Sequence, residues 1–150
     1  MNEFMFVAIE EAKYGIKNKE GGPFGAVVVK DGKIVGRGHN RVLLKKNPTC
    51  HGEVEAITDA CKNLDTFDLS GCEIYTTGEP CPMCYGAILW SNIKKIYYGC
   101  SIIDTNKLGF RDEEFYNLIE NKIKISNQLD RIECLKLYDE YIKLEGKANY

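Results

Sequence analysis

Apolar residues recur with helical spacing near the start of the chain. They stand at Phe6, Ile9, Ala12 and Ile16. Positions three and four residues apart share one face of an α-helix, so this stretch predicts an amphipathic helix. The polar residues and glycines that follow indicate that the helix ends near Asn18.

Two runs rich in β-branched residues come next. Their sequences are PFGAVVVK and KIVGRGHN, and they flank the dipeptide Asp31-Gly32. Asp-Gly favours the positive φ angles of a tight hairpin turn. The two runs therefore predict a pair of antiparallel strands.

Helical and extended patterns then alternate. HGEVEAITDACKN places Val54, Ile57 and Cys61 along one helical stripe. GCEIYTT predicts a strand, CPMCYGAILW a helix with Pro82 in its first turn, and IKKIYYGC another strand. Strands joined through helices pair in parallel, whereas the hairpin is antiparallel, so we expect a mixed sheet with helices on both faces. The fold class is α/β, a three-layer α/β/α sandwich.

The last third of the chain gives a weaker pattern. SIIDTNKLGFRDEEFY indicates a loop that leads into a short helix beginning near Asp112. DRIECLKLYDEYIKLEGK has apolar residues at Ile132, Leu135, Tyr138 and Ile142. This tail has an apolar face that needs cover, either from its own domain or from a partner subunit.

Length and charge narrow the class of protein. With 150 residues, a formal net charge of -2 and a pI near 5.8, the chain fits one domain over residues 1–150. Affinity for nucleic acid rests on clustered Lys and Arg, so this charge argues against nucleic acid as the main partner. No run of about 20 apolar residues predicts a membrane span. The odd count of seven cysteines, without a secretory signal, indicates a reducing, cytoplasmic location.

The strongest chemical signal is the pair Cys81 and Cys84 in GEPCPMCYGAILW. At this spacing near a helix N-terminus, both side chains project from one face, and the positive end of the helix dipole favours their thiolate forms. Such a pair suits half of a zinc site, although C-x-x-C also occurs in redox and structural sites. The chain has no second C-x-x-C and only two histidines, His39 and His51. His51 is the better ligand candidate, because Glu53 follows it in the first turn of a predicted helix.

Two thiolates and one imidazole would leave one position of a zinc ion open, which is typical of catalytic zinc sites. The pKa of a water in that position falls toward neutrality. Glu53 is not needed as a ligand and is free to move the proton of that water. The other cysteines are expected to be core or inert thiols. They are Cys50, Cys61, Cys72, Cys100 and Cys134.

The two motifs together resemble those of the cytidine-deaminase-like zinc deaminases. They are His51-Gly52-Glu53 and Pro80-Cys81-Pro82-Met83-Cys84. The resemblance implies the cytidine-deaminase-like fold with a roughly five-stranded mixed sheet, one Zn²⁺ per subunit and hydrolytic removal of an amine. One residue departs from the pattern, because Gly52 stands where the family has alanine or a similarly small residue.

Within that superfamily the sequence looks most like the bacterial guanine deaminases. The similar stretches are GGPFGAVVV, GHNRV, PCPMCYGAILW, LGFRDEEFY and the final KANY. This resemblance implies conversion of guanine to xanthine and ammonia in purine metabolism. It places Asp112 at the purine pocket, and it implies that Tyr150 closes that pocket. Purine deamination must protonate a poor leaving group, which a second carboxyl group eases, so Asp112 could be a second acid beside Glu53. It also favours a homodimer in which residues 130–150 are exchanged between the subunits.

Three more residues are candidate contacts of a nucleobase substrate. In family members the asparagine that matches Asn40 contacts the substrate, and an amide offers both a donor and an acceptor to a purine edge. Phe24 and Trp90 could sandwich the ring. These three residues and Asp112 also have simpler interpretations: Asn40 as a turn residue, the two aromatic residues as core, and Asp112 as a helix start.

Two classes of function stay open on the sequence alone. The same chemistry could act on guanosine, cytosine, an aminotriazine or an adenosine in tRNA, since tRNA adenosine deaminases share the glycine-rich strand and the zinc motifs. A zinc-stabilised binding module without catalysis is the alternative from a different class. It would give Glu53 no role.

Overall fold

The computed structural model describes residues 1–122 and 125–146. In this part of the chain four strands form one mixed sheet in the order β2-β1-β3-β4. The strand β1 pairs antiparallel with β2 and β3, and β3 pairs parallel with β4. The bounds are β1 Gly25–Lys30, β2 Lys33–His39, β3 Glu73–Gly78 and β4 Lys95–Cys100.

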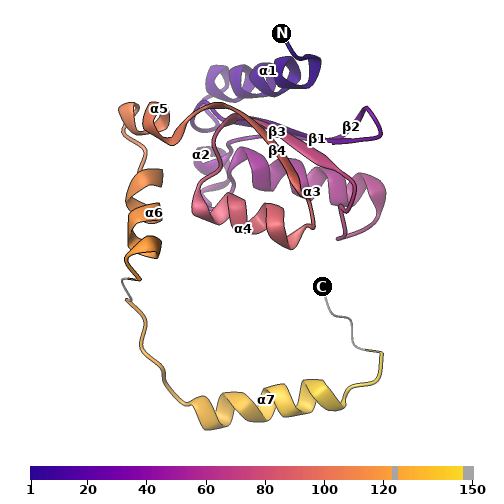
Figure 1. The fold of residues 1–150 in the computed structure, drawn as a ribbon, viewed down its shortest axis with the longest axis vertical. Helices are drawn as coiled ribbons and strands as arrows, with labels where there is room; N and C mark the ends of the chain where they lie inside the picture. Colours follow the sequence, from indigo (N-terminus) through magenta and orange to yellow (C-terminus); the bar gives the residue numbers. More distant parts are fainter. Residues whose placement is uncertain (123–124, 147–150) are drawn as a thin grey trace.

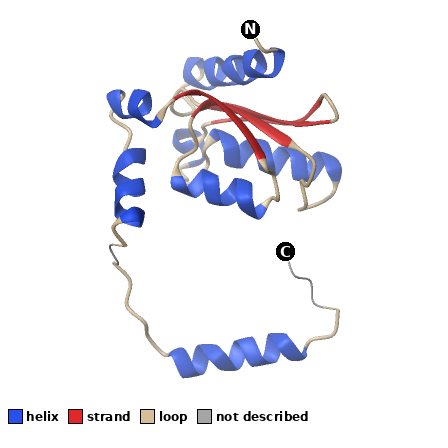
Figure 2. Cartoon of the chain, in the orientation of Figure 1, coloured by secondary structure: helices blue, strands red, loops and turns tan. Residues whose placement is uncertain are grey.

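Helices cover both faces of this sheet, as Figures 1 and 2 show. Helix α1 lies on one face, and α3 and α4 lie on the other, which confirms the three-layer α/β/α sandwich. The helices are α1 Glu3–Lys17, α2 Val42–Lys45, α3 Gly52–Leu64, α4 Pro82–Trp90, α5 Ile102–Lys107, α6 Asp112–Glu120 and α7 Arg131–Lys143. Within the described ranges no helix is both long and apolar enough to cross a membrane.

The central strand β1 is buried on both faces, which explains its unbroken apolar sequence. Val27 and Val29 pack toward α1 in one cluster with Ala8. Ala26 and Val28 point the other way, into the cluster that α3 and α4 complete. Successive side chains of a strand alternate between the two faces, so one apolar strand supplies both cores.

The hairpin between β1 and β2 turns at Asp31 and Gly32, as the sequence predicts. Both residues have positive φ, 50° and 73°. This pair of angles suits the right-handed twist of the two strands that the turn joins. The predicted antiparallel pairing is therefore confirmed.

The described sheet has four strands and not the expected five. After β4 the chain leaves the sheet as a helix, because Ser101 and Asp104 form a capping box in which each side chain bonds the backbone of the other residue. This arrangement starts the short helix α5, which the apolar pattern does not predict. The four-residue helix α2 also lacks a predictable pattern.

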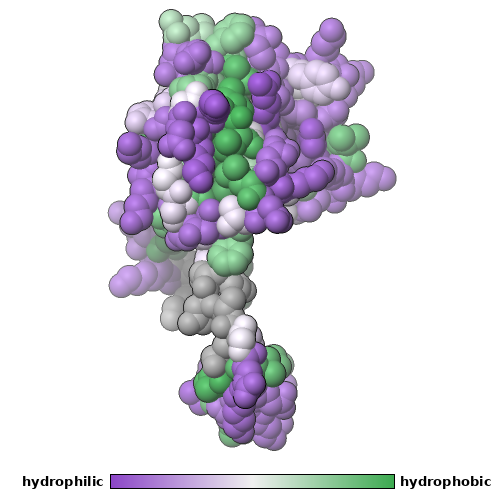
Figure 3. All heavy atoms as spheres, turned by 90° about the vertical axis from the view of Figure 1, so that its right-hand side faces the viewer, coloured by the Kyte–Doolittle hydropathy of each residue, from purple (hydrophilic) through white to green (hydrophobic). Residues whose placement is uncertain are grey.

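Helix α7 lies apart from the sandwich (Figure 1). It forms where the apolar repeat predicts it, and the side chains of Ile132, Leu137 and Tyr138 are exposed on it. Hydrophobic and hydrophilic side chains lie next to each other on this helix, at the bottom of Figure 3. The apolar face that the sequence indicates is thus left uncovered within the described chain.

The buried position of Ile74 gives a test of the core. Ile74 belongs to β3, and its fully buried side chain packs in the same cluster as residues of α3. We expect Ile74→Ala to lower the free energy of unfolding by about 2–5 kcal/mol, because it removes apolar contact and leaves a cavity. The matched control Ile103→Ala, on the exposed side of α5, should change it by about 0.5 kcal/mol or less. Urea unfolding monitored by circular dichroism measures the free energy of unfolding of both variants. Equal losses of stability would contradict the position of Ile74 in the core.

Candidate active site

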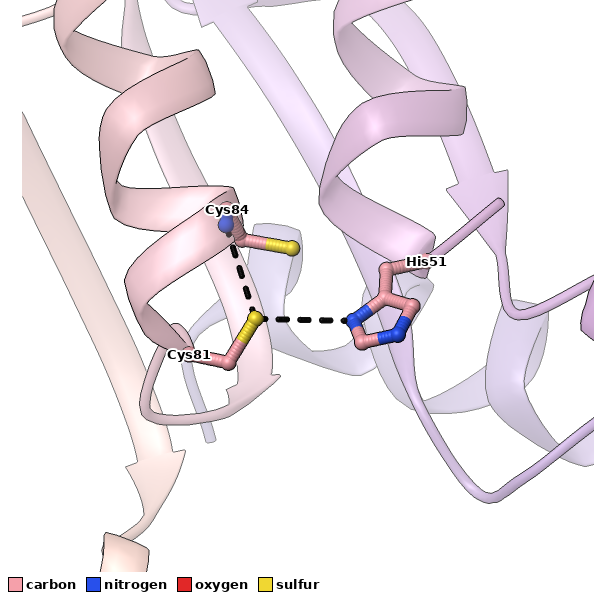
Figure 4. A group of neighbouring side chains, drawn as sticks. All are labelled: His51, Cys81 and Cys84. Atoms are coloured by element: carbon pink, nitrogen blue, oxygen red, sulfur yellow. Dashed lines mark hydrogen bonds between the residues drawn. The ribbon is translucent and has the colours of Figure 1, made fainter. Parts of the chain in front are cut away.

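Helices α3 and α4 begin side by side, and the candidate metal donors lie at these two N-termini (Figure 4). His51 is the N-cap of α3, with an extended backbone, and Cys81 is the N-cap of α4. Cys84 is in the first turn of α4, which Pro82 opens without loss of a hydrogen bond. The positive ends of both helix dipoles therefore point at the sulfur atoms and favour their anionic forms.

The three donor atoms fit a zinc ion. Cys81 Sγ lies 3.6 Å from His51 Nδ1, and the donor atoms of His51, Cys81 and Cys84 all lie within 4.8 Å of one another. Zinc bonds of about 2.3 Å to sulfur and about 2.1 Å to nitrogen, at the tetrahedral angle, would set such a pair of donors roughly 3.6 Å apart. Three protein donors leave one coordination position for water or substrate, as in catalytic zinc sites.

Hydrogen bonding within this group divides the protons unequally. The hydrogen bond from Cys84, aided by that from His51, lowers the pKa of Cys81 to about 4 in spite of its burial. The same bond to Cys81, together with burial, raises the pKa of the Cys84 thiol. The hydrogen bond with Cys81 also raises the pKa of His51. Cys81 is thus the more readily ionised of the two cysteines, whereas Cys84 must release a proton when a metal binds.

Glu53 lies in the first turn of α3 and is almost fully buried. Burial raises the pKa of its carboxyl group, and the negative charge of Cys81 adds to the effect. A hydrogen bond with Cys84 acts in the opposite direction. A carboxyl group with a raised pKa beside a metal centre is suited to take up a proton and return it.

A cavity of about 580 Å³ opens beside these residues. Three of the predicted substrate-site residues line it: Phe24, Asn40 and Asp112. His51 and Cys81 reach it from the metal centre. Its other lining residues are Gly21, Gly22, Val42, Leu43, Pro48, Glu79, Met83, Phe110, Arg111 and Phe115.

Trp90 does not line this cavity, so the predicted sandwich of Phe24 and Trp90 is not formed. Trp90 ends α4 and is largely exposed, beside a separate surface hollow with Gly86, Leu89 and Asn92. Cys81 caps the opposite end of that helix, and the rise of about 1.5 Å per residue separates the two ends by more than 10 Å. Tyr150, the other predicted aromatic contact, lies outside the described residues.

The aromatic partner of Phe24 is Phe110, which sequence reasoning missed. The two rings meet edge to face, with centroids 4.9 Å apart. Arg111 was missed as well; its guanidinium lies 5.0 Å from the centre of the Phe115 ring, and both side chains line the cavity. The stretch LGFRDEEFY contains Asp112 and resembles the family, but the spacing of its aromatic residues does not reveal which side chains turn inward.

Asp112 opens α6, whose N-cap is Arg111 without a side-chain capping bond. It is partly buried and lines the cavity. Burial, followed by the negative charge of Cys81, raises the pKa of its carboxyl group. Asp112 therefore lies in the first turn of the helix and does not act as its N-cap.

Gly52, the residue that departs from the family pattern, packs against backbone. A Cβ atom added to it would lie 3.0 Å from the carbonyl oxygen of Phe24. That is tighter than ordinary van der Waals contact, so a larger residue would require the start of β1 to move slightly. In this chain glycine lets the start of α3 approach the residue that lines the cavity.

An α/β sandwich that brings a histidine and two cysteines together near a buried glutamate has the features of a catalytic zinc enzyme. The family follows from residues 1–100, which match the model described as the cytidine and deoxycytidylate deaminase zinc-binding region. The chain belongs to this family, and it is a zinc-binding enzyme of the type that removes an amine by hydrolysis.

Relatives of two kinds are similar to this chain. Guanine deaminase of Bacillus subtilis (strain 168) is 44% identical over 117 residues, which cover 78% of this chain and 75% of the relative. The X-ray structure of guanine deaminase from Bacillus subtilis matches with a TM-score of 0.91 and 38% identity, over 100% of this chain and 99% of that chain. The tRNA-specific adenosine deaminase of Buchnera aphidicola subsp. Schizaphis graminum (strain Sg) is 37% identical over 140 residues, 93% of this chain and 92% of the relative.

The metal centre predicts a selective loss of zinc. We expect Cys84→Ser to lower zinc affinity by more than about 100-fold. Loss of a residue that only hydrogen-bonds to a metal ligand can already lower it by up to about 100-fold. Cys61→Ser, a change of the same type on α3 but outside the three-donor group, should keep the wild-type zinc content. Elemental analysis after dialysis against a weak chelator measures both. Wild-type zinc content in Cys84→Ser would exclude Cys84 as a ligand.

Proposed function

We propose that this protein deaminates guanine, so that guanine and water give xanthine and ammonia. The observation that carries the proposal is the likeness to the guanine deaminase structure over the whole chain. That likeness extends beyond the zinc motifs and takes in the segment after β4, from which Phe110, Asp112 and Phe115 line the cavity. The base is selected by this segment, whereas the zinc motifs serve every member of the family.

The cavity offers suitable groups for a flat purine. The rings of Phe24 and Phe110 supply an aromatic wall. The side-chain oxygen of Asn40 accepts a hydrogen bond from the Val42 N–H at 3.1 Å. This bond fixes the orientation of the amide and leaves its NH₂ group to donate to an acceptor on the purine edge. Asn40 is therefore proposed as a substrate-binding residue together with Phe24.

In the proposed reaction His51, Cys81 and Cys84 would hold one Zn²⁺, which would supply Lewis-acid activation of the attacking water. Glu53 takes a proton from that water and passes it to the ring nitrogen beside the carbon that bears the amine. The carbon becomes a better electrophile, and the water oxygen bonds to it. Glu53 then takes the remaining proton of the added hydroxyl group and gives it to the amine, so the C–N bond breaks, the C=O bond forms and ammonia leaves.

Asp112 is proposed as the second acid. It lines the same cavity as His51 and Cys81, and burial raises the pKa of its carboxyl group. A carboxyl group with a raised pKa can carry a proton at neutral pH and donate it to a poor leaving group. Asp112 would thus assist Glu53 when the amine becomes ammonia.

Charge favours a free base over tRNA. The chain has a formal net charge of -2, whereas RNA binding requires clustered positive charge. Among the described lining residues of the cavity, Arg111 is the only lysine or arginine. The tRNA-specific relatives are nevertheless similar enough that an adenosine in tRNA is the alternative to test.

The proposed location is the cytoplasm. The seven cysteines form no disulfide in the described chain, which suits a reducing compartment.

The whole chain of residues 1–150 is proposed to act as one catalytic domain within a homodimer that exchanges residues 130–150. The exposed apolar residues Ile132, Leu137 and Tyr138 of α7 support this, because a free apolar helix face is costly in water. The separation of α7 from its own sandwich leaves it available to a second subunit (Figure 1). Tyr150 would then close the cavity of the neighbouring subunit.

Ammonia release from a panel of substrates tests the base. Zinc-loaded protein should release ammonia from guanine, and not from guanosine, cytosine, adenine or a tRNA anticodon stem-loop. Glu53→Gln should keep its zinc and lose about 10²- to 10⁴-fold in turnover, because the proton carrier is removed. Glu113→Gln, on the exposed surface of α6, serves as the control and should keep wild-type turnover. Ammonia release from the stem-loop or from cytosine would show that guanine is the wrong substrate, while the protein would still be a deaminase. Full activity of Glu53→Gln would show that Glu53 is not the proton carrier.

Complementation between two inactive chains tests the exchange. One chain carries Glu53→Gln, and the other carries Tyr150→Ala. If Tyr150 completes the neighbour's site, a mixed dimer has one site with both native residues. Random reassortment should therefore restore about a quarter of wild-type guanine turnover. If the mixture remains as inactive as its components, Tyr150 does not act across the dimer.

A further inference from the structure

A cluster of charged side chains lies behind one wall of the cavity, outside the metal centre. It joins α1, the loop before β1, the end of β2, α2 and α3. Its members are Glu11, Glu20, His39, Arg41, Lys45 and Glu55. His39 is at its centre and is only 2% exposed.

Both ring nitrogens of His39 face carboxylates. Nδ1 lies 3.1 Å from Glu11 Oε2, and Nε2 lies 2.6 Å from Glu20 Oε2. A neutral imidazole has one N–H and can donate to only one of them. The imidazolium has two and satisfies both, so this pair of contacts fits the charged ring better than either neutral tautomer.

Two other groups pack against the ring: the cationic Arg41, whose charge opposes that of an imidazolium, and the neutral Tyr14. Arg41 Nε lies 3.4 Å from His39 Nε2 and 3.6 Å from Glu20 Oε2. The contact of 2.6 Å uses the Nε2 proton for Glu20, so Arg41 Nε serves the same carboxylate and not the ring. The neutral ring of Tyr14 from α1 lies over His39, with centroids 5.5 Å apart.

The far side of the cluster is paired as well. Arg41 and Lys45 both hold the carboxylate of Glu55, at 3.1 Å and 2.8 Å. Although burial opposes it, Lys45 and Cys50 lower the pKa of Glu55 through hydrogen bonds. Three carboxylates thus face His39, Arg41 and Lys45, and the charges balance only when His39 is protonated.

This cluster attaches one loop to another segment of the chain. The loop contains Glu20, and the segment follows β2. The carbonyl of Glu20 accepts the N–H groups of Leu43 and Leu44, at 3.0 Å and 3.1 Å. The N–H of Asn40 donates to the carbonyl of Phe24 at 2.9 Å. The two segments therefore form one wall, and each contributes lining residues to the cavity.

The fit between the two segments is close at the residue proposed to bind the purine. A Cβ atom added to Gly21 would lie 2.0 Å from the side-chain oxygen of Asn40. The loop must therefore keep its place for Asn40 to keep its orientation. Because His39 is adjacent to Asn40 in the chain and bonded to Glu20 next to Gly21, it ties both sides of this contact.

We propose that His39, as an imidazolium held between Glu11 and Glu20, is a positioning residue for substrate binding. It holds the Glu20 loop against Asn40 and so sets the wall of the cavity that faces the base. It touches none of the zinc donors or Glu53, and so it acts on binding and not on the chemical step. The binding part of this inference rests on the proposed function, in which the base is guanine.

Glu11→Gln and Glu10→Gln form a matched pair of variants on α1. Glu11→Gln removes the negative charge beside His39 Nδ1. Glu10→Gln makes the same chemical change one residue away, where Glu10 pairs with Lys13 in solvent. We expect Glu11→Gln to raise the KM for guanine about tenfold, with kcat almost unchanged, since the hydrogen bond from His39 Nδ1 loses its charged acceptor. Glu10→Gln should leave both constants at the wild-type values.

Two measurements without substrate accompany the kinetics. Nitrogen-15 NMR of the zinc-loaded wild-type protein at neutral pH should show protons on both ring nitrogens of His39. Amide hydrogen exchange at Leu43 and Leu44 should be faster in Glu11→Gln than in Glu10→Gln, because both amides depend on the position of Glu20.

One ring proton on His39, or equal amide exchange in the two variants, would overturn the proposal. An unchanged KM in Glu11→Gln, together with a lower melting temperature, would assign the cluster a structural role only and would also overturn it. If the wild-type protein does not turn over guanine, while the NMR and exchange results are as expected, the positioning of Asn40 is supported and guanine is the wrong base.

Discussion

The packing of α3 and α4 on one face of the sheet is the constraint on which the site depends. Ala56 of α3 and Ile88 of α4 are fully buried in one cluster with Ile74 of β3. Because this core fixes both helices, it also fixes where their N-termini meet. The donors of the metal centre are held by regular structure, whereas irregular segments supply most of the cavity wall, which is the usual division between a rigid scaffold and variable loops.

The parts of the site that follow from local chemistry could be predicted from the sequence. His51 and Glu53 share one helix start, and Cys81 and Cys84 share another, so their spacing alone indicates which side chains can converge. The Asp31-Gly32 turn is equally local. In each case a few consecutive residues contain the whole signal, because caps and tight turns are decided by neighbours in the chain.

The parts that depend on distant segments could not be predicted. Phe110 meets Phe24 only after β4 and α5 have carried the chain back to the cavity. Trp90 follows Cys81 closely in sequence, yet a whole helix separates the two ends. The number of strands depends on Ser101 and Asp104, whose capping box starts a helix where a further strand could have followed. The residue type alone does not show whether an aromatic side chain lines a cavity or lies on the exposed surface.

The contact between His51 and Cys81 spans thirty positions of the chain, with the whole of α3 and β3 between them. A metal ion held by both residues closes this long loop, so it acts as a cross-link in addition to its chemical role. The entropy that such a link removes from the unfolded chain grows with the length of the loop. The ion would thus fasten the start of α3 to the start of α4, and metal supply would govern how long the folded enzyme persists as well as how fast it works.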